Sequence, residues 1–224
     1  MELKGAVAVV TGANRGLGRH LADQLVQRGA KVYAAARRPE TVDLAGVTPL
    51  RLDVTDEESV RAAARVASDA TLLVNNAGIS TGTTLVTGEL DAVRRELETN
   101  FFGPLALTRE FAPVIEGNGG GAVLNVLSAL SWLHPAGLGS YAATKAATWA
   151  QTNAVREELA PRGITVTALH VAYMDTDMAA RVPADQKVDP ADVAAQALDA
   201  VADGLPEILA DDVTRQVKRG LAGA

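Results

Sequence analysis

The chain has 224 residues, of which 48% are hydrophobic and 21% charged; this composition supports a buried core, excludes wholesale disorder and fits a single domain over residues 1–224. Its 21 basic and 27 acidic residues give a formal net charge of −6, which argues against a nucleic-acid or anionic-membrane partner. The absence of cysteine excludes disulfide scaffolds, cysteine-ligated zinc and thiol nucleophiles, and it fits a reducing, cytoplasmic location.

Short β-branched runs alternate with Ala- and Leu-rich stretches, a pattern that predicts βαβ units on a parallel sheet. In chain order, we expect strands at residues 7–10, 31–36, 49–53, 72–75, 122–127, 164–170 and 207–210. We expect helices at residues 16–29, 56–69, 88–116, 140–160 and 191–202, with Gly103-Pro104 kinking or dividing the third. The predicted fold is α/β: one doubly wound, Rossmann-type, seven-stranded parallel sheet with helices on both faces. Ligands of such folds bind beyond the carboxyl ends of the strands.

A glycine-rich segment, TGANRGLG, follows the first strand directly at residues 11–18. Its glycines allow positive φ angles and a close approach of the backbone to a ligand, and its amides at the helix start favour a pyrophosphate. The alternative is a strand-to-helix turn that binds nothing. The spacing of the glycines, four and then two residues apart, differs from the usual dinucleotide fingerprint but meets the same physical requirements.

Two arginines, Arg37 and Arg38, follow the second strand. Ala36 stands where an NAD enzyme would carry the acidic residue that binds the ribose, and Arg15 adds a third positive charge from the glycine-rich turn. A missing carboxylate beside guanidinium groups favours the 2′-phosphate of NADP(H) over NAD(H). The alternative is that these arginines only face solvent.

Tyr141 and Lys145 lie four residues apart at the start of a predicted helix, so that they share one face. A nearby ammonium is expected to lower the pKa of the phenol, which could then exchange a proton with a carbonyl or an alcohol. Ser128 follows the fifth strand at the same edge of the sheet and could orient the carbonyl oxygen. Alone, such a Tyr/Lys pair often arises by chance.

The order and intervals of these motifs resemble those of the short-chain dehydrogenase/reductase family, from Lys4 to about Ala210. The shared motifs are TGANRGLG, Asn75-Asn76-Ala77-Gly78, Asn100, Ser128 and Tyr141-Ala142-Ala143-Thr144-Lys145. Five separated signals make the resemblance specific. It implies an NADP(H)-dependent oxidoreductase, a carbonyl reductase or alcohol dehydrogenase, acting on a small or medium ketone, aldehyde or secondary alcohol.

The resemblance also implies a role for individual residues. Tyr141 would be the general acid/base, Lys145 the group that binds the nicotinamide ribose and tunes Tyr141, and Ser128 the donor to the substrate oxygen. Asn100 would help to hold a water that joins Lys145 to solvent. The residues expected at the cofactor are Gly12, Asn14, Arg15, Gly16, Leu17, Gly18, Arg37, Arg38, Asp53, Val54, Asn76, Ala77, Gly78, Tyr141, Lys145 and Thr176.

One departure from the family pattern follows the sixth strand, where Val171-Ala172 replaces the usual Pro-Gly. The loop at about 171–189 is expected to face the substrate, and its shortness suggests an open site. His170 is expected to be a structural residue at the strand end. Candidates for an apolar substrate wall are Leu130, Trp132, Leu133, His134, Leu138, Tyr173 and Met174, which could equally be ordinary loop and core residues.

Two other functions compete with a reductase. A cofactor-binding regulatory or scaffold protein would keep the fold without turnover, but the intact catalytic set argues against it. A lyase resembling halohydrin dehalogenases would replace the lysine by arginine and lose the glycine turn, which this chain does not. The scattered histidines predict no metal site. Small and apolar residues on several faces of two helices, together with the resemblance, predict a homodimer or homotetramer, in which Trp149 is either an interface or a core residue.

Overall fold

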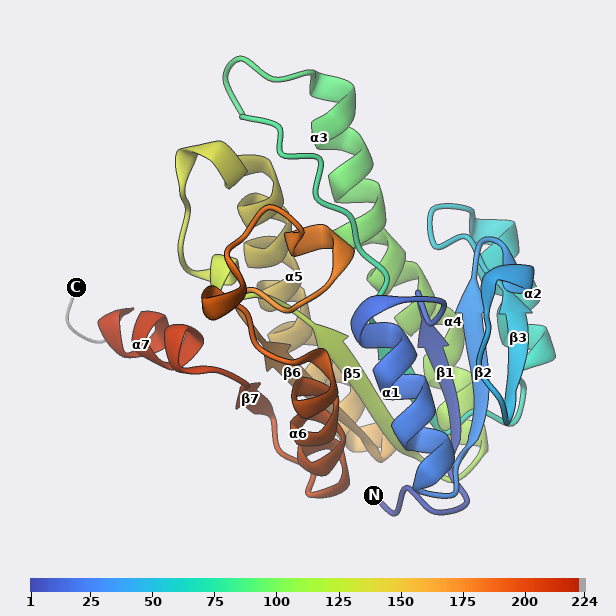
Figure 1. Ribbon diagram of the computed structural model, residues 1–224. Helices are drawn as coiled ribbons and strands as arrows, with labels where there is room; N and C mark the ends of the chain where they lie inside the picture. Colours follow the sequence, from blue (N-terminus) through green and yellow to red (C-terminus); the bar gives the residue numbers. More distant parts are fainter. Residues whose placement is uncertain (222–224) are drawn as a thin grey trace.

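A seven-stranded parallel sheet runs through the middle of the molecule, and helices cover both of its faces (Figure 1). The computed structural model describes residues 1–221. The strand order is β3-β2-β1-β4-β5-β6-β7, so the chain reverses direction across the sheet between β1 and β4. The strands are β1 (Val7–Thr11), β2 (Lys31–Ala36), β3 (Val47–Arg51), β4 (Leu72–Asn75), β5 (Gly121–Val126), β6 (Ile164–His170) and β7 (Glu207–Leu209).

Two helices cover one face of the sheet and three cover the other. The first face packs against α1 (Gly16–Gln27) and α6 (Pro190–Ala202), which lie side by side in Figure 1. The second face packs against α2 (Glu57–Val66), α4 (Gly103–Gly117) and α5 (Gly139–Leu159). The remaining helices are α3 (Leu90–Leu97) and α7 (Asp212–Leu221).

The strand sequences are apolar on both sides because both faces of the sheet are buried. In β1, Ala8 and Val10 point into the core beneath α1 and α6, whereas Val9 points into the core beneath α2 and α4. The same alternation recurs in β4 and β5, as expected from the two-residue period of a strand. The predicted doubly wound, seven-stranded sheet is confirmed.

The third strand lies earlier than predicted, at Val47–Arg51 rather than 49–53. It forms one edge of the sheet, with β2 as its partner. An edge strand tolerates Pro49 in its interior, because the side without a neighbouring strand needs no backbone donor. The sequence pattern placed this proline at the strand start, which shifted the whole prediction by two residues.

The long helix expected at 88–116 is divided, and Pro104 explains where. A wider, π-helical turn, Glu98–Phe102, separates α3 from α4. Because Pro104 has no amide hydrogen, it cannot donate to the carbonyl of Asn100 four residues earlier. That carbonyl instead accepts a hydrogen bond from the Thr148 hydroxyl of α5 at 2.8 Å. The break therefore frees a backbone acceptor that faces α5.

The C-terminal helix α7 was not predicted. Its start is fixed by Asp211, whose carboxylate accepts hydrogen bonds from the Thr214 amide and hydroxyl, each at 2.8 Å. Near its end, Lys218 binds Glu207 of β7. None of the helices within residues 1–221 has the length and hydropathy that a bilayer span requires.

Candidate active site

The glycine-rich turn joins β1 to α1 at the carboxyl edge of the sheet, and its glycines are required by geometry. Gly12 and Gly16 have φ angles of 65° and 52°, which disfavour any side chain. Gly18 has an ordinary φ but no room, since a Cβ there would lie 2.3 Å from the Gly12 carbonyl oxygen and 2.4 Å from Asn76 Nδ2. The turn thus exposes backbone where a pyrophosphate would approach the start of α1.

Replacing Gly18 by Ala is expected to destabilise the fold by about 1–3 kcal/mol, because the new methyl group must displace backbone. The same displacement is expected to weaken NADPH binding. Thermal unfolding and a fluorescence titration with NADPH measure the two effects. Gly117→Ala is the control, because a Cβ at Gly117 has no neighbour within 4 Å. If Gly18→Ala and Gly117→Ala had the same stability and the same affinity for NADPH, the structure would not require a glycine at position 18.

The segment after β4 is tied to the glycine-rich turn. The Asn76 side-chain amide donates to the Thr11 carbonyl at 2.8 Å. The Thr11 hydroxyl accepts from the amides of Asn76 and Ala77, each at 2.9 Å. A Cβ on Gly78 would lie 3.2 Å from Asn100 Oδ1. Asn75, in contrast, is buried and donates to Asn125 and Thr108, so its contacts are structural.

The arginines expected at the cofactor have different surroundings. Arg37 and Arg38 are exposed after β2, and no ion pair within residues 1–221 involves them. Arg15 forms an exposed ion pair with Asp177 at 3.2 Å. Exposed pairs of this kind are weak, so a phosphate could compete for Arg15. Neither Arg37 nor Arg38 is thus held by an acidic side chain among the described residues.

Other residues predicted at the cofactor already have protein partners. Asn14 donates to the Thr41 hydroxyl at 3.1 Å. Asp53 accepts from the Thr55 amide and hydroxyl. Leu17 is buried in the core under α1, so only its backbone can reach a ligand. Val54 lies against Gly103, so that a Cβ added to this glycine would contact the Val54 side chain. Thr176 lies against Gly16 and its methyl group would contact a Cβ added there.

Asn100 ties three segments together. Its side chain donates to the Ile79 carbonyl and accepts from the Ile79 amide, both at 2.9 Å, and it also donates to the Thr144 hydroxyl at 3.1 Å. Its carbonyl accepts from Thr148. Asn100 therefore braces the loop after β4 against the helix that carries Tyr141 and Lys145.

Of the other predicted catalytic residues, Ser128 follows β5, and Tyr141 and Lys145 lie on α5. Lys145 is buried and donates to the Val126 carbonyl at 2.8 Å, and its Nζ lies 5.5 Å from the centre of the Tyr141 ring. Val126 ends β5, two residues before Ser128. The Ser128 hydroxyl oxygen accepts from the Leu130 amide at 3.1 Å, which leaves its hydrogen free to be donated. One lysine thus connects the strand of Ser128 to the helix of Tyr141.

The pKa of Tyr141 differs from the value that the sequence predicts. Burial raises the pKa of Tyr141 above its ordinary value, and the carboxylate of Glu96 raises that pKa further. Burial lowers the pKa of Lys145 to about 8. The prediction of a lowered pKa for Tyr141 is therefore wrong. Desolvation of the phenolate dominates, and the ammonium of Lys145 is directed at the Val126 carbonyl.

Glu96 of α3 is a residue that sequence reasoning missed. It is fully buried, and its Oε1 accepts from both the amide and the hydroxyl of Thr81. Its Oε2 has no hydrogen-bond partner in the described part of the chain. A carboxylate in a run of charged residues looked like part of a solvated helix face. Only the packing of α3 against α5 brings it near Tyr141.

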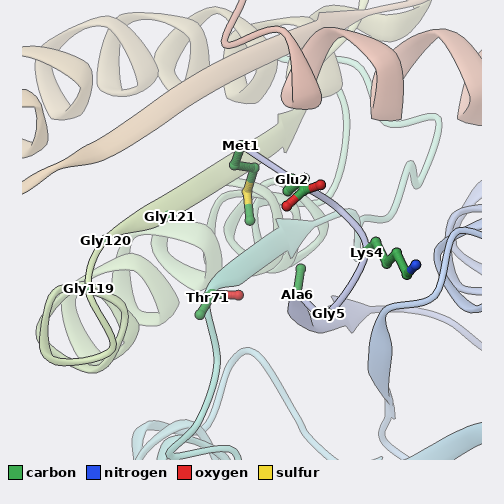
Figure 2. A pocket seen from close by; sticks show the side chains of 9 residues that line it. All are labelled: Met1, Glu2, Lys4, Gly5, Ala6, Thr71, Gly119, Gly120 and Gly121. Atoms are coloured by element: carbon green, nitrogen blue, oxygen red, sulfur yellow. The ribbon is translucent and has the colours of Figure 1, made fainter.

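A cavity of about 330 Å³ lies at the opposite edge of the sheet (Figure 2). Its lining includes Ala6, Thr71 and Gly121, which lie at the amino ends of β1, β4 and β5. The rest of the lining comes from the N-terminal segment and the loop before β5: Met1, Glu2, Lys4, Gly5, Gly119 and Gly120. None of the predicted catalytic residues lies there, as expected for a fold whose ligands bind at the carboxyl edge.

The carboxyl edge of the sheet carries both the glycine-rich turn after β1 and the contact of Lys145 with the end of β5, an arrangement typical of a dinucleotide-binding α/β protein with a Tyr/Lys pair. A family model described as short chain dehydrogenase matches residues 6–187. A 3-oxoacyl-(acyl-carrier-protein) reductase of Vibrio cholerae is 32% identical over 216 residues, which cover 87% of this chain and 88% of that protein. The chain belongs to the short-chain dehydrogenase/reductase family.

Two solved structures extend the comparison. A short chain dehydrogenase from Burkholderia cenocepacia, in complex with NADP, is 38% identical with a TM-score of 0.95, over 99% of this chain and 94% of that one. A short chain dehydrogenase/reductase from Burkholderia phymatum, in complex with NAD, is 27% identical with a TM-score of 0.87, over 97% and 93%. Membership makes the protein a nicotinamide-dependent oxidoreductase acting between alcohols and carbonyls.

Proposed function

We propose that the protein is an NADP(H)-dependent carbonyl reductase or alcohol dehydrogenase, with Ser128, Tyr141 and Lys145 as catalytic residues and Asn100 as their support. The observation that carries this proposal is the hydrogen bond from Lys145 to the Val126 carbonyl. It joins β5, which leads to Ser128, to α5, which carries Tyr141, at the edge that holds the glycine-rich turn.

The residues of the chain suit proton transfer to a carbonyl oxygen. A bound nicotinamide cofactor supplies the hydride. The raised pKa of Tyr141 keeps its hydroxyl protonated. Tyr141 donates this proton to the substrate oxygen. Ser128 donates its free hydroxyl hydrogen to the same oxygen and orients it. Lys145 offsets the negative charge left on the phenolate, and the two ammonium hydrogens not bonded to Val126 remain for the cofactor ribose.

The surroundings of β2 support a preference for NADPH. The strand ends at the small, buried Ala36, and Arg37 and Arg38 follow it into solvent. The proposal assigns the 2′-phosphate to these two guanidinium groups, because arginine binds phosphate through two parallel hydrogen bonds. The Burkholderia cenocepacia relative, which was solved with NADP, agrees with this preference.

Replacing both Arg37 and Arg38 by Ala is expected to raise the KM for NADPH by about tenfold to a hundredfold, which is about 1.4–2.8 kcal/mol for the pair, because charged hydrogen bonds at an exposed site are weakened by solvent. The KM for NADH should change little. Steady-state kinetics with both cofactors measure the ratio. Arg219→Ala, an exposed arginine of α7, controls for the loss of positive charge. An unchanged ratio of the two KM values would refute the phosphate pocket.

The substrate is proposed to be a ketone or aldehyde with an apolar substituent. Tyr173 and Leu133, both exposed, and the partly buried Leu130 remain candidates for an apolar wall in the loops after β5 and β6. Trp132 does not, because its ring is buried against His170. We propose that residues 171–189 form the substrate loop, which a short bridge between Met174 and Val188 closes at its base.

A panel of ketones, aldehydes and 3-oxoacyl thioesters, followed at the nicotinamide absorbance with NADPH and NADH in turn, tests the function. Turnover of any member with NADPH supports it. Binding of NADPH without turnover of any member would favour the scaffold alternative.

The assembly is proposed to be a homodimer or homotetramer, and sedimentation of the purified chain measures it. Trp149 is partly buried and lies edge-to-face against Trp132 at 5.7 Å between ring centres, so one of its faces already packs within the chain. A cytoplasmic location, suggested by the cysteine-free composition, belongs to the same proposal.

A further inference from the structure

His170, at the end of β6, touches the backbone of Ser128. Its side chain is fully buried, and Nδ1 lies 3.1 Å from the Ser128 carbonyl oxygen. A carbonyl oxygen can only accept, so Nδ1 must carry the hydrogen. On either side of Ser128, the Leu127 amide donates to the Leu169 carbonyl at 2.7 Å and the Ala129 amide donates to the Val171 carbonyl at 3.2 Å. Neither bond involves the Ser128 carbonyl, so this acceptor receives no backbone hydrogen bond from β6. The imidazole supplies that bond.

The imidazole is itself held from two further directions. The ring of Trp132 stacks on it, with 4.0 Å between centres and 20° between planes. Its Nε2 lies 3.4 Å from Glu207 Oε1, which is ion-pair distance when the imidazole is protonated, and Nε2 has no hydrogen-bond partner in the part of the chain that the structure describes. Contacts with His170 and then Lys218 lower the pKa of Glu207 to about 2, so this carboxylate stays charged at neutral pH.

Lys218 of α7 completes the arrangement. Its ammonium binds both oxygens of Glu207 at 2.9 Å and lies 4.3 Å above the centre of the Trp132 ring. A connected series of contacts therefore runs from α7, through β7, to the end of β6 and the loop of Ser128. A histidine that served only to fill the core would need neither Glu207 beside Nε2 nor a hydrogen bond from Nδ1 to the Ser128 carbonyl.

We infer that His170 is a positioning residue that sets the orientation of the Ser128 hydroxyl through its hydrogen bond to the Ser128 carbonyl. This inference rests on the proposed function, since Ser128 acts there as the donor to the substrate oxygen. The Ser128 carbonyl also accepts from the Ser131 amide at 3.0 Å, in the short turn Ala129–Ser131, whose Leu130 amide donates to the Ser128 hydroxyl. Rotation of the peptide between Ser128 and Ala129 would shift the Leu130 amide, and with it the hydroxyl oxygen that accepts from that amide.

Two substitutions separate the hydrogen bond from the packing. In His170→Asn, the side-chain amide nitrogen takes the place of Nδ1 and can still donate to Ser128. In His170→Phe, a ring remains to stack on Trp132 but the donor is lost. We expect His170→Phe to lower kcat by about tenfold to a hundredfold with the KM for NADPH within about twofold of wild type. We expect His170→Asn to recover most of kcat.

Hydrogen–deuterium exchange of the full chain gives a second measurement that does not depend on turnover. The amides of residues 128–132 should exchange faster in His170→Phe and return toward the wild-type rate in His170→Asn. Thermal unfolding shows whether each variant is folded, and an unfolded Phe variant is replaced by His170→Leu in the same comparison.

The outcomes are distinct for the two proposals. Wild-type chain without turnover on any carbonyl refutes the proposed function, while the exchange data still decide whether His170 holds the Ser128 loop. Wild-type turnover together with an unchanged kcat in His170→Phe overturns the inference. So does an Asn variant as slow as the Phe variant, because the donated hydrogen would then be irrelevant.

Discussion

Replacing Tyr141 by Phe is expected to lower kcat by about a hundredfold to ten-thousandfold, the usual contribution of a positioned acid or base. The substitution removes one oxygen and keeps the ring that packs beside Lys145. Without the phenol, no group in the proposed set can protonate the substrate oxygen directly. Steady-state turnover with NADPH, on the best carbonyl of the substrate panel, measures the loss.

Binding of NADPH to Tyr141→Phe should stay close to that of wild type, because the glycine-rich turn and the arginines after β2 are untouched. A fluorescence titration checks this. Tyr33→Phe, which removes a phenol hydroxyl that binds Lys31 and Asp69 outside the proposed site, is the matched control and should keep its turnover. Near-normal kcat in Tyr141→Phe would remove Tyr141 from the mechanism.

Replacing Lys145 by Met is expected to lower kcat by orders of magnitude and to change how stability depends on pH. Burial depresses the pKa of Lys145 from 10.5 to about 8. Between these values the unfolded chain binds more protons at this position than the folded chain does, so wild-type stability rises with pH across this window. The gain is about 3 kcal/mol in total, at about 1.4 kcal/mol per pH unit.

The Met variant should lack this gain. Denaturant unfolding of wild type and variant at pH 7, 8, 9 and 10 measures the difference in the free energy of unfolding, which should widen in favour of wild type as pH rises. Lys4→Met removes an exposed lysine and should follow the wild-type curve. Parallel curves for wild type and Lys145→Met would show that the ammonium carries no burial penalty.

Local patterns predict the elements of this fold well where both faces of a strand are buried. The apolar runs of β1, β4 and β6 are typical of parallel strands that are buried on both faces. At the sheet edge the pattern weakens, and Pro49 led to a displaced β3. The helix α7 has few apolar residues, and its start depends on Asp211, whose role as a cap becomes visible only beside Thr214.

The candidate site was predictable where spacing along one element decides it. Tyr141 and Lys145 share a helix face, and Gly12 and Gly16 need positive φ, so short stretches of sequence carry the information. Contacts between distant segments were not predictable. Glu96 approaches Tyr141 only through the packing of α3 on α5, and Arg15 meets Asp177 across 162 positions of sequence. The pKa prediction failed for the same reason, because burial is a property of the packed molecule.

The reversal of direction between β1 and β4 divides the sheet into two halves. The glycines and the arginines proposed to select the dinucleotide belong to one half, and the residues proposed to handle the carbonyl belong to the other. The bonds between Thr11 and Asn76 form the seam. Substitutions in the first half are therefore expected to alter coenzyme choice while leaving the groups that transfer the proton in place, so that the two properties can evolve separately.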